Sequence, residues 1–141
     1  MWLPTGTTFK ALFVFLLMKE ISGFSYDDNP DIVNLTPSNF NSEVIASDDV
    51  WIVEFYAKWC PHCQKFAPNW IDLASRMKGI AKIGAVDAPK YRSLGQKYGV
   101  MRTPTILIFG ADKENYKTYH GSRSVKEMEA YFRNLVSKEK S

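Results

Sequence analysis

The sequence predicts an α/β fold of three layers, a central mixed sheet with helices on both faces. Two observations predict it: short runs of β-branched and aromatic residues alternate with longer amphipathic segments, and turn residues separate them. The early strand–helix–strand units imply parallel pairing, and the last two strands imply a hairpin. The expected order is β-α-β-α-β-α-β-β-α, within a chain of 141 residues that suits one domain.

The first 25 residues are expected to lie outside this fold, as a secretory signal peptide. An apolar run at 11–18 is too short to span a bilayer, and small residues follow at Gly23 and Ser25. We expect cleavage after Ser25 or after Gly23; a buried helix or a membrane anchor is the alternative. The domain then covers 26–141 and enters an oxidising compartment, where a thiol pair can persist as a disulfide.

The domain begins with a short strand and a helix. Residues 31–35 are expected to form an edge strand. Pro37 suits the first turn of a helix because its missing N–H is not needed there, and Thr36 can cap this helix, which runs to Ala46.

The next two elements are the clearest in the chain. Residues 50–56 are nearly all β-branched or aromatic, which predicts a strand buried on both faces. A long helix is expected over 60–77, kinked at Pro68 because proline cannot donate the helical hydrogen bond. Gly79 ends it.

The rest of the domain continues the alternation. The remaining strands are expected at 80–86, 105–109 and 116–119, and the remaining helices at 91–98 and 124–136. Ser124 can cap the final helix. Its inward-facing residues are expected to be Val125, Met128, Phe132, Leu135 and Val136.

Composition excludes several classes of protein. Hydrophobic residues make up 45% and charged residues 23%, as in ordinary globular domains. The net charge of +3 arises from interleaved signs, so it does not indicate nucleic-acid binding. Two cysteines, Cys60 and Cys63, are too few for a disulfide-stapled scaffold or a four-thiolate zinc site, and we expect no metal or organic cofactor.

The cysteines lie in Trp59-Cys60-Pro61-His62-Cys63, directly after a buried strand and at the start of a helix. Free N–H groups and the helix dipole favour a thiolate at Cys60, and His62 can add positive or hydrogen-bonding character. We therefore expect Cys60 to be the exposed attacking thiol and Cys63 the buried resolving thiol, which can close a Cys60–Cys63 disulfide. A structural pair or a metal site is the alternative.

Glu54 is anomalous because it lies inside the apolar segment WIVEFY. A buried carboxylic acid has a raised pKa and can exchange a proton near neutral pH, so we expect Glu54 to take or give the proton of Cys63. The alternative places Glu54 at a solvated edge. Lys82, in the next strand, can pair with Glu54 or can lie exposed at the start of that strand.

Pro104 precedes an apolar strand, where a proline would otherwise interrupt the ladder. A cis bond after Thr103 resolves this and exposes the Thr103 backbone as a short edge for an extended substrate. A tight turn with a trans proline is the alternative. Arg123, taken alone, is a solvated charge.

The segment WIVEFYAKWCPHCQKFAPNW resembles the active-site segment of a thioredoxin-like domain of the protein disulfide isomerase family. The segments VNLTPSNFNSEV, AKIGAVDAPKYRSLGQKYGV and PTILIFG extend the resemblance over Asp31 to Val136. It is closest to the first catalytic domain of endoplasmic-reticulum isomerases with tandem thioredoxin domains. It implies a thioredoxin-like fold.

The resemblance also implies roles for individual residues. Cys60 would be the nucleophile and Cys63 the resolving thiol, with Glu54 as the proton-transfer acid and Lys82 as its partner. Pro104 would be the cis-proline that faces the disulfide. Arg123 would be a mobile arginine that swings toward Cys63 and lowers its pKa.

Two departures from the family pattern concern the redox site. Pro61 replaces the usual glycine, and CPHC resembles the motif of a bacterial periplasmic oxidant. Proline stiffens the loop and suggests a more oxidising couple. Arg102 and Thr103 replace the usual glycine–aromatic pair, which gives the sulfurs a smaller, polar neighbour.

We therefore expect a thiol–disulfide oxidoreductase or isomerase that acts on unfolded or disulfide-containing secretory proteins. Clients would be recognised through exposed backbone and apolar side chains, with Trp59, Thr103 and Pro104 as contact residues. Glutathione or an oxidase would be the electron partner, and the mature chain would be a monomer without membrane or nucleic-acid contact. The chain ends in KEKS rather than a retention signal, so residence in the endoplasmic reticulum and secretion both stay open. The alternative function is a non-catalytic adaptor or secreted effector with a static disulfide.

Overall fold

The computed structural model describes residues 24–141 and contains one mixed sheet with the strand order β1-β3-β2-β4-β5. The strands are β1 Val33–Asn34, β2 Trp51–Tyr56, β3 Lys82–Asp87, β4 Thr105–Phe109 and β5 Lys117–Thr118. β3 pairs in parallel with β1 and β2, whereas β4 pairs antiparallel with β2 and β5. The predicted parallel units, final hairpin and edge position of the first strand are therefore confirmed. The predicted signal peptide lies outside the described residues, except for Phe24 and Ser25.

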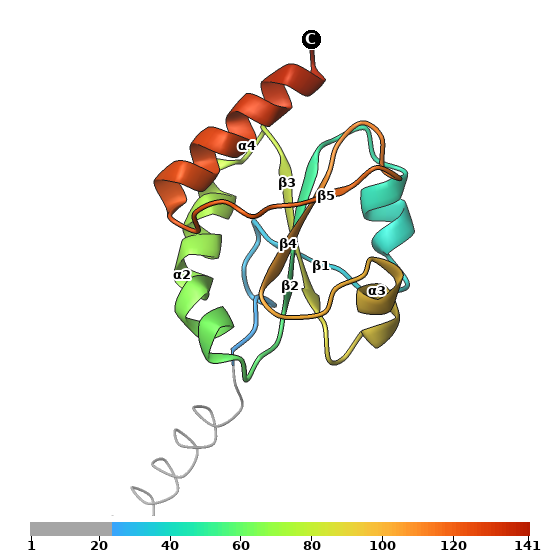
Figure 1. The fold of residues 1–141 in the computed structure, drawn as a ribbon, viewed down its shortest axis with the longest axis vertical. Helices are drawn as coiled ribbons and strands as arrows, with labels where there is room; N and C mark the ends of the chain where they lie inside the picture. The colour runs from blue at the N-terminus through green and yellow to red at the C-terminus, as the bar shows by residue number, and fades with distance from the viewer. Residues whose placement is uncertain (1–23) are drawn as a thin grey trace, which may run out of the picture.

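Helices cover both faces of this sheet (Figure 1). The helices are η1 Asn41–Ile45, α2 Pro61–Arg76, α3 Arg92–Lys97 and α4 Val125–Glu139. α2 and α4 lie together on one face, and η1 and α3 lie on the other. The three-layer α/β architecture is confirmed, and within residues 24–141 no helix is long and apolar enough to cross a membrane.

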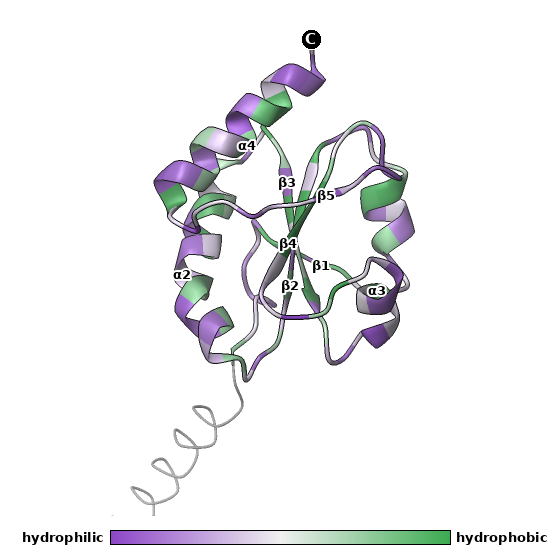
Figure 2. Cartoon of the chain, viewed as in Figure 1, coloured by the Kyte–Doolittle hydropathy of each residue, from purple (hydrophilic) through white to green (hydrophobic). Residues whose placement is uncertain are grey.

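The side-chain alternation of β2 divides the core in two. Ile52 and Tyr56 pack toward α2 and α4, and Trp51, Val53 and Phe55 pack toward α3 and η1. All six residues of β2 are buried, as the sequence predicted. Figure 2 shows apolar residues concentrated on the central strands, with polar and apolar residues mixed along α4.

The first helix differs most from the prediction. The segment expected to form a helix over 37–46 makes turns and then a single π-helical stretch, Asn41–Ile45. Thr36 is not its cap: Phe40 occupies that position, without a side-chain cap hydrogen bond. The Thr36 carbonyl instead accepts the N–H groups of Asn39 and Phe40 in the preceding turn. The polar residues around Thr36 favour such local bonds over a regular helix.

The other boundaries agree within a few residues. α2 continues through Pro68 to Arg76, and α4 begins after the Ser124 cap, whose hydroxyl accepts the Glu127 N–H. Of the five residues expected to face inward on α4, Met128, Phe132 and Val136 are buried. The other two, Val125 and Leu135, are partly buried. β2 thus leads through the four-residue loop 57–60 into α2; Cys60 ends this loop and Cys63 lies in the first turn of the helix.

Candidate active site

Cys60 and Cys63 occupy the first turn of α2. Cys60 is the N-cap residue, with extended backbone, and Pro61 follows as the first helical residue. The Cys63 N–H donates to Cys60 Sγ at 3.4 Å. The sulfur thus accepts the backbone hydrogen bond that a side-chain oxygen accepts at most helix N-caps. Both thiols are free in this structure.

The pKa of Cys60 is held below its ordinary value. Burial opposes ionisation, but hydrogen bonds from the Cys63 thiol, the Thr103 side chain and the backbone N–H groups of Cys63 and His62 outweigh it. His62 acts here through its backbone, and its side chain is exposed. Cys60 is partly exposed, so its thiolate can meet a substrate.

Cys63 has the opposite character. It is 0% exposed, and burial raises its pKa to about 11. Its hydrogen bond to Cys60 and the Cys60 charge raise it further, against the lowering effect of the Ala57 backbone and the Thr103 side chain. One thiol is therefore ready to attack, while the other needs a proton acceptor before it can react.

Glu54 is the buried acid of the site. It is 0% exposed and lies on the α2 and α4 face of β2, between Ile52 and Tyr56. Burial raises its pKa to about 8, partly offset by a hydrogen bond from Tyr26 and by the charge of Arg123, whereas Cys60 raises it. The alternative that placed Glu54 at a solvated edge is wrong, because β2 is the central strand.

Lys82 is not the partner of Glu54, and this prediction is wrong. Lys82 is exposed at the first position of β3 and pairs with Trp51, whereas Ala85 lies opposite Glu54. An odd separation of three residues places Lys82 and Ala85 on opposite faces of the strand. Lys82 therefore lies on the face away from Glu54. The sequence located the strand correctly but not its register.

The Thr103–Pro104 bond is cis, as the resemblance implied. The Cys60 thiol donates to the Thr103 carbonyl at 3.6 Å, which places this loop directly against the attacking sulfur. Pro104 is buried, and its carbonyl accepts a hydrogen bond from the Arg123 guanidinium at 3.0 Å. Arg123 also lies over the Phe66 ring, 5.8 Å from its centroid. Arg123 is exposed, as expected of a solvated charge, and these two contacts also anchor it at the site.

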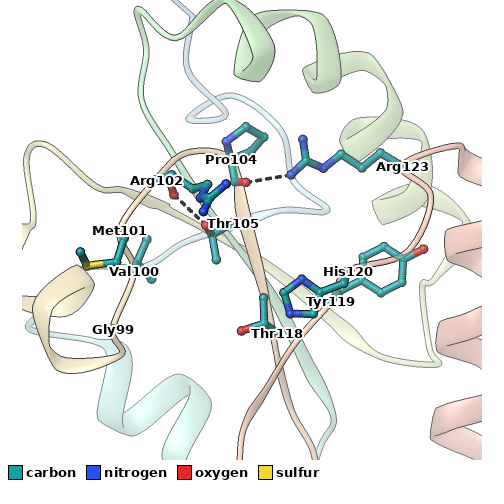
Figure 3. Close-up of a pocket in the computed structure, with 10 residues that line it drawn as sticks. All are labelled: Gly99, Val100, Met101, Arg102, Pro104, Thr105, Thr118, Tyr119, His120 and Arg123. Carbon is teal, nitrogen blue, oxygen red and sulfur yellow. Dashed lines mark hydrogen bonds between the residues drawn. The ribbon is translucent and has the colours of Figure 1, made fainter.

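A groove of about 360 Å³ runs beside the 99–105 loop (Figure 3). The loop forms one side, and residues 118–120 with Arg123 form the other. Its titratable side chains are the basic Arg102, His120 and Arg123 and the phenol of Tyr119. Two large apolar side chains, Met101 on this loop and Trp59 before Cys60, are 92% and 61% exposed.

The structure therefore brings together most of the predicted residues and adds one. Cys60, Cys63, Glu54, Thr103, Pro104 and Arg123 meet at the junction of β2 and α2, with Trp59 and His62 exposed on its outside. Sequence reasoning missed Tyr26, whose hydroxyl donates to Glu54 Oε2 at 2.8 Å. A tyrosine in a polar terminal segment gives little sign that it will be buried.

Comparison with known proteins identifies the fold family. Residues 31–134 match the family profile described as Thioredoxin. The chain belongs to the thioredoxin family. A thioredoxin domain explains the order of the elements, and the match covers the strand-to-helix junction with both cysteines.

The relatives of this thioredoxin chain are protein disulfide isomerases. The chain is 52% identical to human "Protein disulfide-isomerase A6" over 99 residues, which are 70% of this chain and 22% of the relative. It is 47% identical to the Caenorhabditis elegans "Protein disulfide-isomerase A6 homolog" over 115 residues, 82% and 26% of the two chains. The chain thus spans about a quarter of the length of these curated relatives.

Solved structures agree with this assignment. The crystal structure of the J-Trx1 fragment of ERdj5 matches with a TM-score of 0.76 and 32% identity, covering 82% of this chain and 55% of that one. Human ERp44 form I matches with a TM-score of 0.67 and 26% identity, over 73% and 29% of the chains. The predicted resemblance to thioredoxin-like domains of the protein disulfide isomerase family is confirmed.

Proposed function

We propose that this chain is a thiol–disulfide oxidoreductase that exchanges disulfides with secretory-pathway proteins. The observation that carries the proposal is the contrast between the two thiols of one helical turn. Cys60 has a lowered pKa at the N-terminus of α2, and buried Cys63 has a raised pKa. This contrast supports an attacking and a resolving role, and the relatives are named disulfide isomerases.

In the reductive direction, the Cys60 thiolate attacks one sulfur of a substrate disulfide and releases the other as a thiolate. Cys63, having given its proton to Glu54, then attacks Cys60 Sγ of the mixed disulfide. The Cys60–Cys63 disulfide forms and the second substrate sulfur leaves as a thiolate. Two electrons pass from the protein to the substrate, and the reverse sequence oxidises a substrate dithiol.

The loop at Thr103 and the groove beside it are the proposed client-binding surface. The Thr103 carbonyl lies against Cys60, so a polypeptide extended along this loop would present its sulfur to Cys60. Met101 on this loop and Trp59 next to Cys60 offer exposed apolar contacts. Unfolded or disulfide-containing proteins fit such a surface because their backbone and apolar side chains are accessible.

The proposed electron partners are glutathione or an oxidase. Both fit a site that transfers two electrons through sulfur alone, without a metal or an organic cofactor. We propose that the domain released from the signal peptide acts as a monomer in the secretory pathway, in the endoplasmic reticulum lumen or after secretion.

The proposed route into the secretory pathway is a signal peptide within residues 1–25. Of the two expected cleavage points, the packing of Phe24 against Tyr26 and Tyr56 favours the one after Gly23. Cleavage there would keep Phe24 in the mature domain.

The tests are reduction of insulin and refolding of a protein that starts either reduced or with scrambled disulfides. Cys60→Ser should abolish both activities, and Cys63→Ser should trap disulfide-linked clients on Cys60. Full activity of the Cys60→Ser variant would refute this mechanism. A reduction potential far below that of the endoplasmic reticulum, together with no turnover, would instead indicate an adaptor or effector with a static disulfide.

A further inference from the structure

Tyr26 is a buried group that the mechanism above does not use. It is 1% exposed, and its hydroxyl donates to Glu54 Oε2 at 2.8 Å, a bond between residues 28 positions apart. Within residues 24–141, the other carboxyl oxygen, Glu54 Oε1, is buried without a hydrogen-bond partner. One oxygen of the acid is thus engaged, and the other is left to accept a proton.

The position of Tyr26 is fixed by aromatic packing. Its ring makes edge contacts with Tyr56 at 5.0 Å and with Phe24 at 5.3 Å between centroids. Its carbonyl accepts the Asn29 N–H in a turn. Figure 1 shows this start of the described chain beside the loop from β2 to α2. The hydroxyl therefore reaches Glu54 from a packed, oriented ring.

Tyr26 is the hydrogen-bond donor to Glu54 at a position where the neighbouring strands place no basic residue opposite the acid. Ala85 lies opposite Glu54 on β3, Ile106 lies opposite it on β4, and Lys82 is on the other face. The groups on the surrounding elements that shift the pKa of Glu54 are Tyr26, Cys60 and Arg123, whereas the pKa of Tyr56 is itself raised by the charge of Glu54. Tyr26 is the one that donates a hydrogen bond to its carboxyl.

Tyr26 serves this purpose because it does not ionise in the working pH range. Burial, together with the charge of Glu54, raises the pKa of Tyr26 far above its ordinary value. The phenol therefore keeps its proton and remains a donor. Its hydrogen bond to the charged form of Glu54 lowers the pKa of that acid and so opposes burial, which raises it.

We propose that Tyr26 is a positioning residue, which holds Glu54 by Oε2 so that Oε1 can accept the Cys63 proton when Cys63 resolves a mixed disulfide. The step is balanced: Cys63 loses its proton to Glu54, its sulfur bonds to Cys60 Sγ, and the substrate sulfur leaves with the electron pair. Tyr26 touches none of the reacting sulfurs and acts through Glu54. This inference rests on the proposed function.

The test follows a single turnover. A mixed disulfide of Cys60 with 5-thio-2-nitrobenzoate releases the coloured thiolate when Cys63 attacks, and the release rate is measured from pH 6 to 10. Tyr26→Phe removes only the hydroxyl. It should move the midpoint of the pH–rate profile up by about one unit and slow release at pH 7 by about tenfold, because a bond to a carboxylate is lost.

Two controls separate positioning from packing. Tyr56→Phe removes a buried hydroxyl from the same aromatic cluster and should leave the midpoint in place. In a Glu54→Gln background, Tyr26→Phe should cause no further slowing, since both changes act on the same proton acceptor. A Tyr26→Phe profile that overlays the wild type, or an equal shift in Tyr56→Phe, would overturn the inference.

A direct titration gives a second measurement. The side-chain carboxyl carbon of Glu54 in the reduced protein should titrate about one pH unit higher in Tyr26→Phe than in the wild type. An unchanged titration would refute the role of Tyr26 whatever the kinetics show. Failure of the wild-type mixed disulfide to release thiolate at any pH would instead count against the proposed function and, with it, this inference.

Discussion

Replacing Glu54 by glutamine should remove a pH-dependent cost in stability that the wild-type domain carries. Glutamine keeps the shape of the side chain and can still accept the Tyr26 hydrogen bond, but it does not titrate. Glu54 is fully buried, with its pKa raised by burial to about 8 from an ordinary 4.5. The folded protein therefore keeps a proton that the unfolded chain loses at a much lower pH.

The sign and size of the effect follow from this difference. The stabilising contribution is fully present below pH 4.5 and is lost as the pH rises to about 8, because the unfolded state binds fewer protons in that window. At 1.36 kcal/mol for each pH unit, the loss is about 5 kcal/mol. This is comparable to the total stability of a small domain.

Urea denaturation of the reduced proteins between pH 4.5 and 8 measures this loss. The free energy of unfolding of the wild type should fall by about 5 kcal/mol relative to Glu54→Gln across the window. The comparison isolates Glu54 because both proteins carry the same cysteines. Parallel stability curves for the two proteins would show that Glu54 has an ordinary pKa, and the reasoning about its burial would then be wrong.

Three further substitutions test other parts of the structure. Thr103→Val removes the hydroxyl while keeping the shape, so the pKa of Cys60 should rise toward its ordinary value; thiolate absorbance near 240 nm measures it, and an unchanged titration would refute the role of Thr103. Lys82→Met should leave both that titration and insulin reduction unchanged, because Lys82 is exposed on the other face; a large loss of activity would contradict the register. Gly84→Ala should cost about 1–3 kcal/mol in urea denaturation, because a Cβ there would lie 2.5 Å from Leu35 Cδ1; unchanged stability would show that Leu35 can move aside.

The sequence predicted those features that local patterns determine. The apolar run before the cysteines gave β2, which is buried along its whole length, and the same run made Glu54 conspicuous. The contrast between the two cysteines followed from their places in the first helical turn. The family resemblance supplied the cis bond before Pro104 and drew attention to Arg123.

Two of the errors concern contacts between segments that are distant in the sequence, and a third is local. The register of β3 against β2 decides which residue faces Glu54, and a strand pattern alone does not determine register. The burial of Tyr26 depends on a tertiary contact with β2. The π-helical stretch Asn41–Ile45 replaced a regular helix because the preceding polar residues formed turns, which a propensity argument does not resolve.

The unequal burial of the tryptophans has a spectroscopic consequence. Of the three in residues 24–141, Trp51 and Trp70 are almost fully buried, whereas Trp59 is 61% exposed and adjoins Cys60. Indole emission moves to longer wavelength in water, so emission collected at the long-wavelength edge comes mainly from Trp59. The unlabelled protein thus carries a fluorophore beside its attacking sulfur, whose emission would report both a change at Cys60 and the arrival of a polypeptide over it.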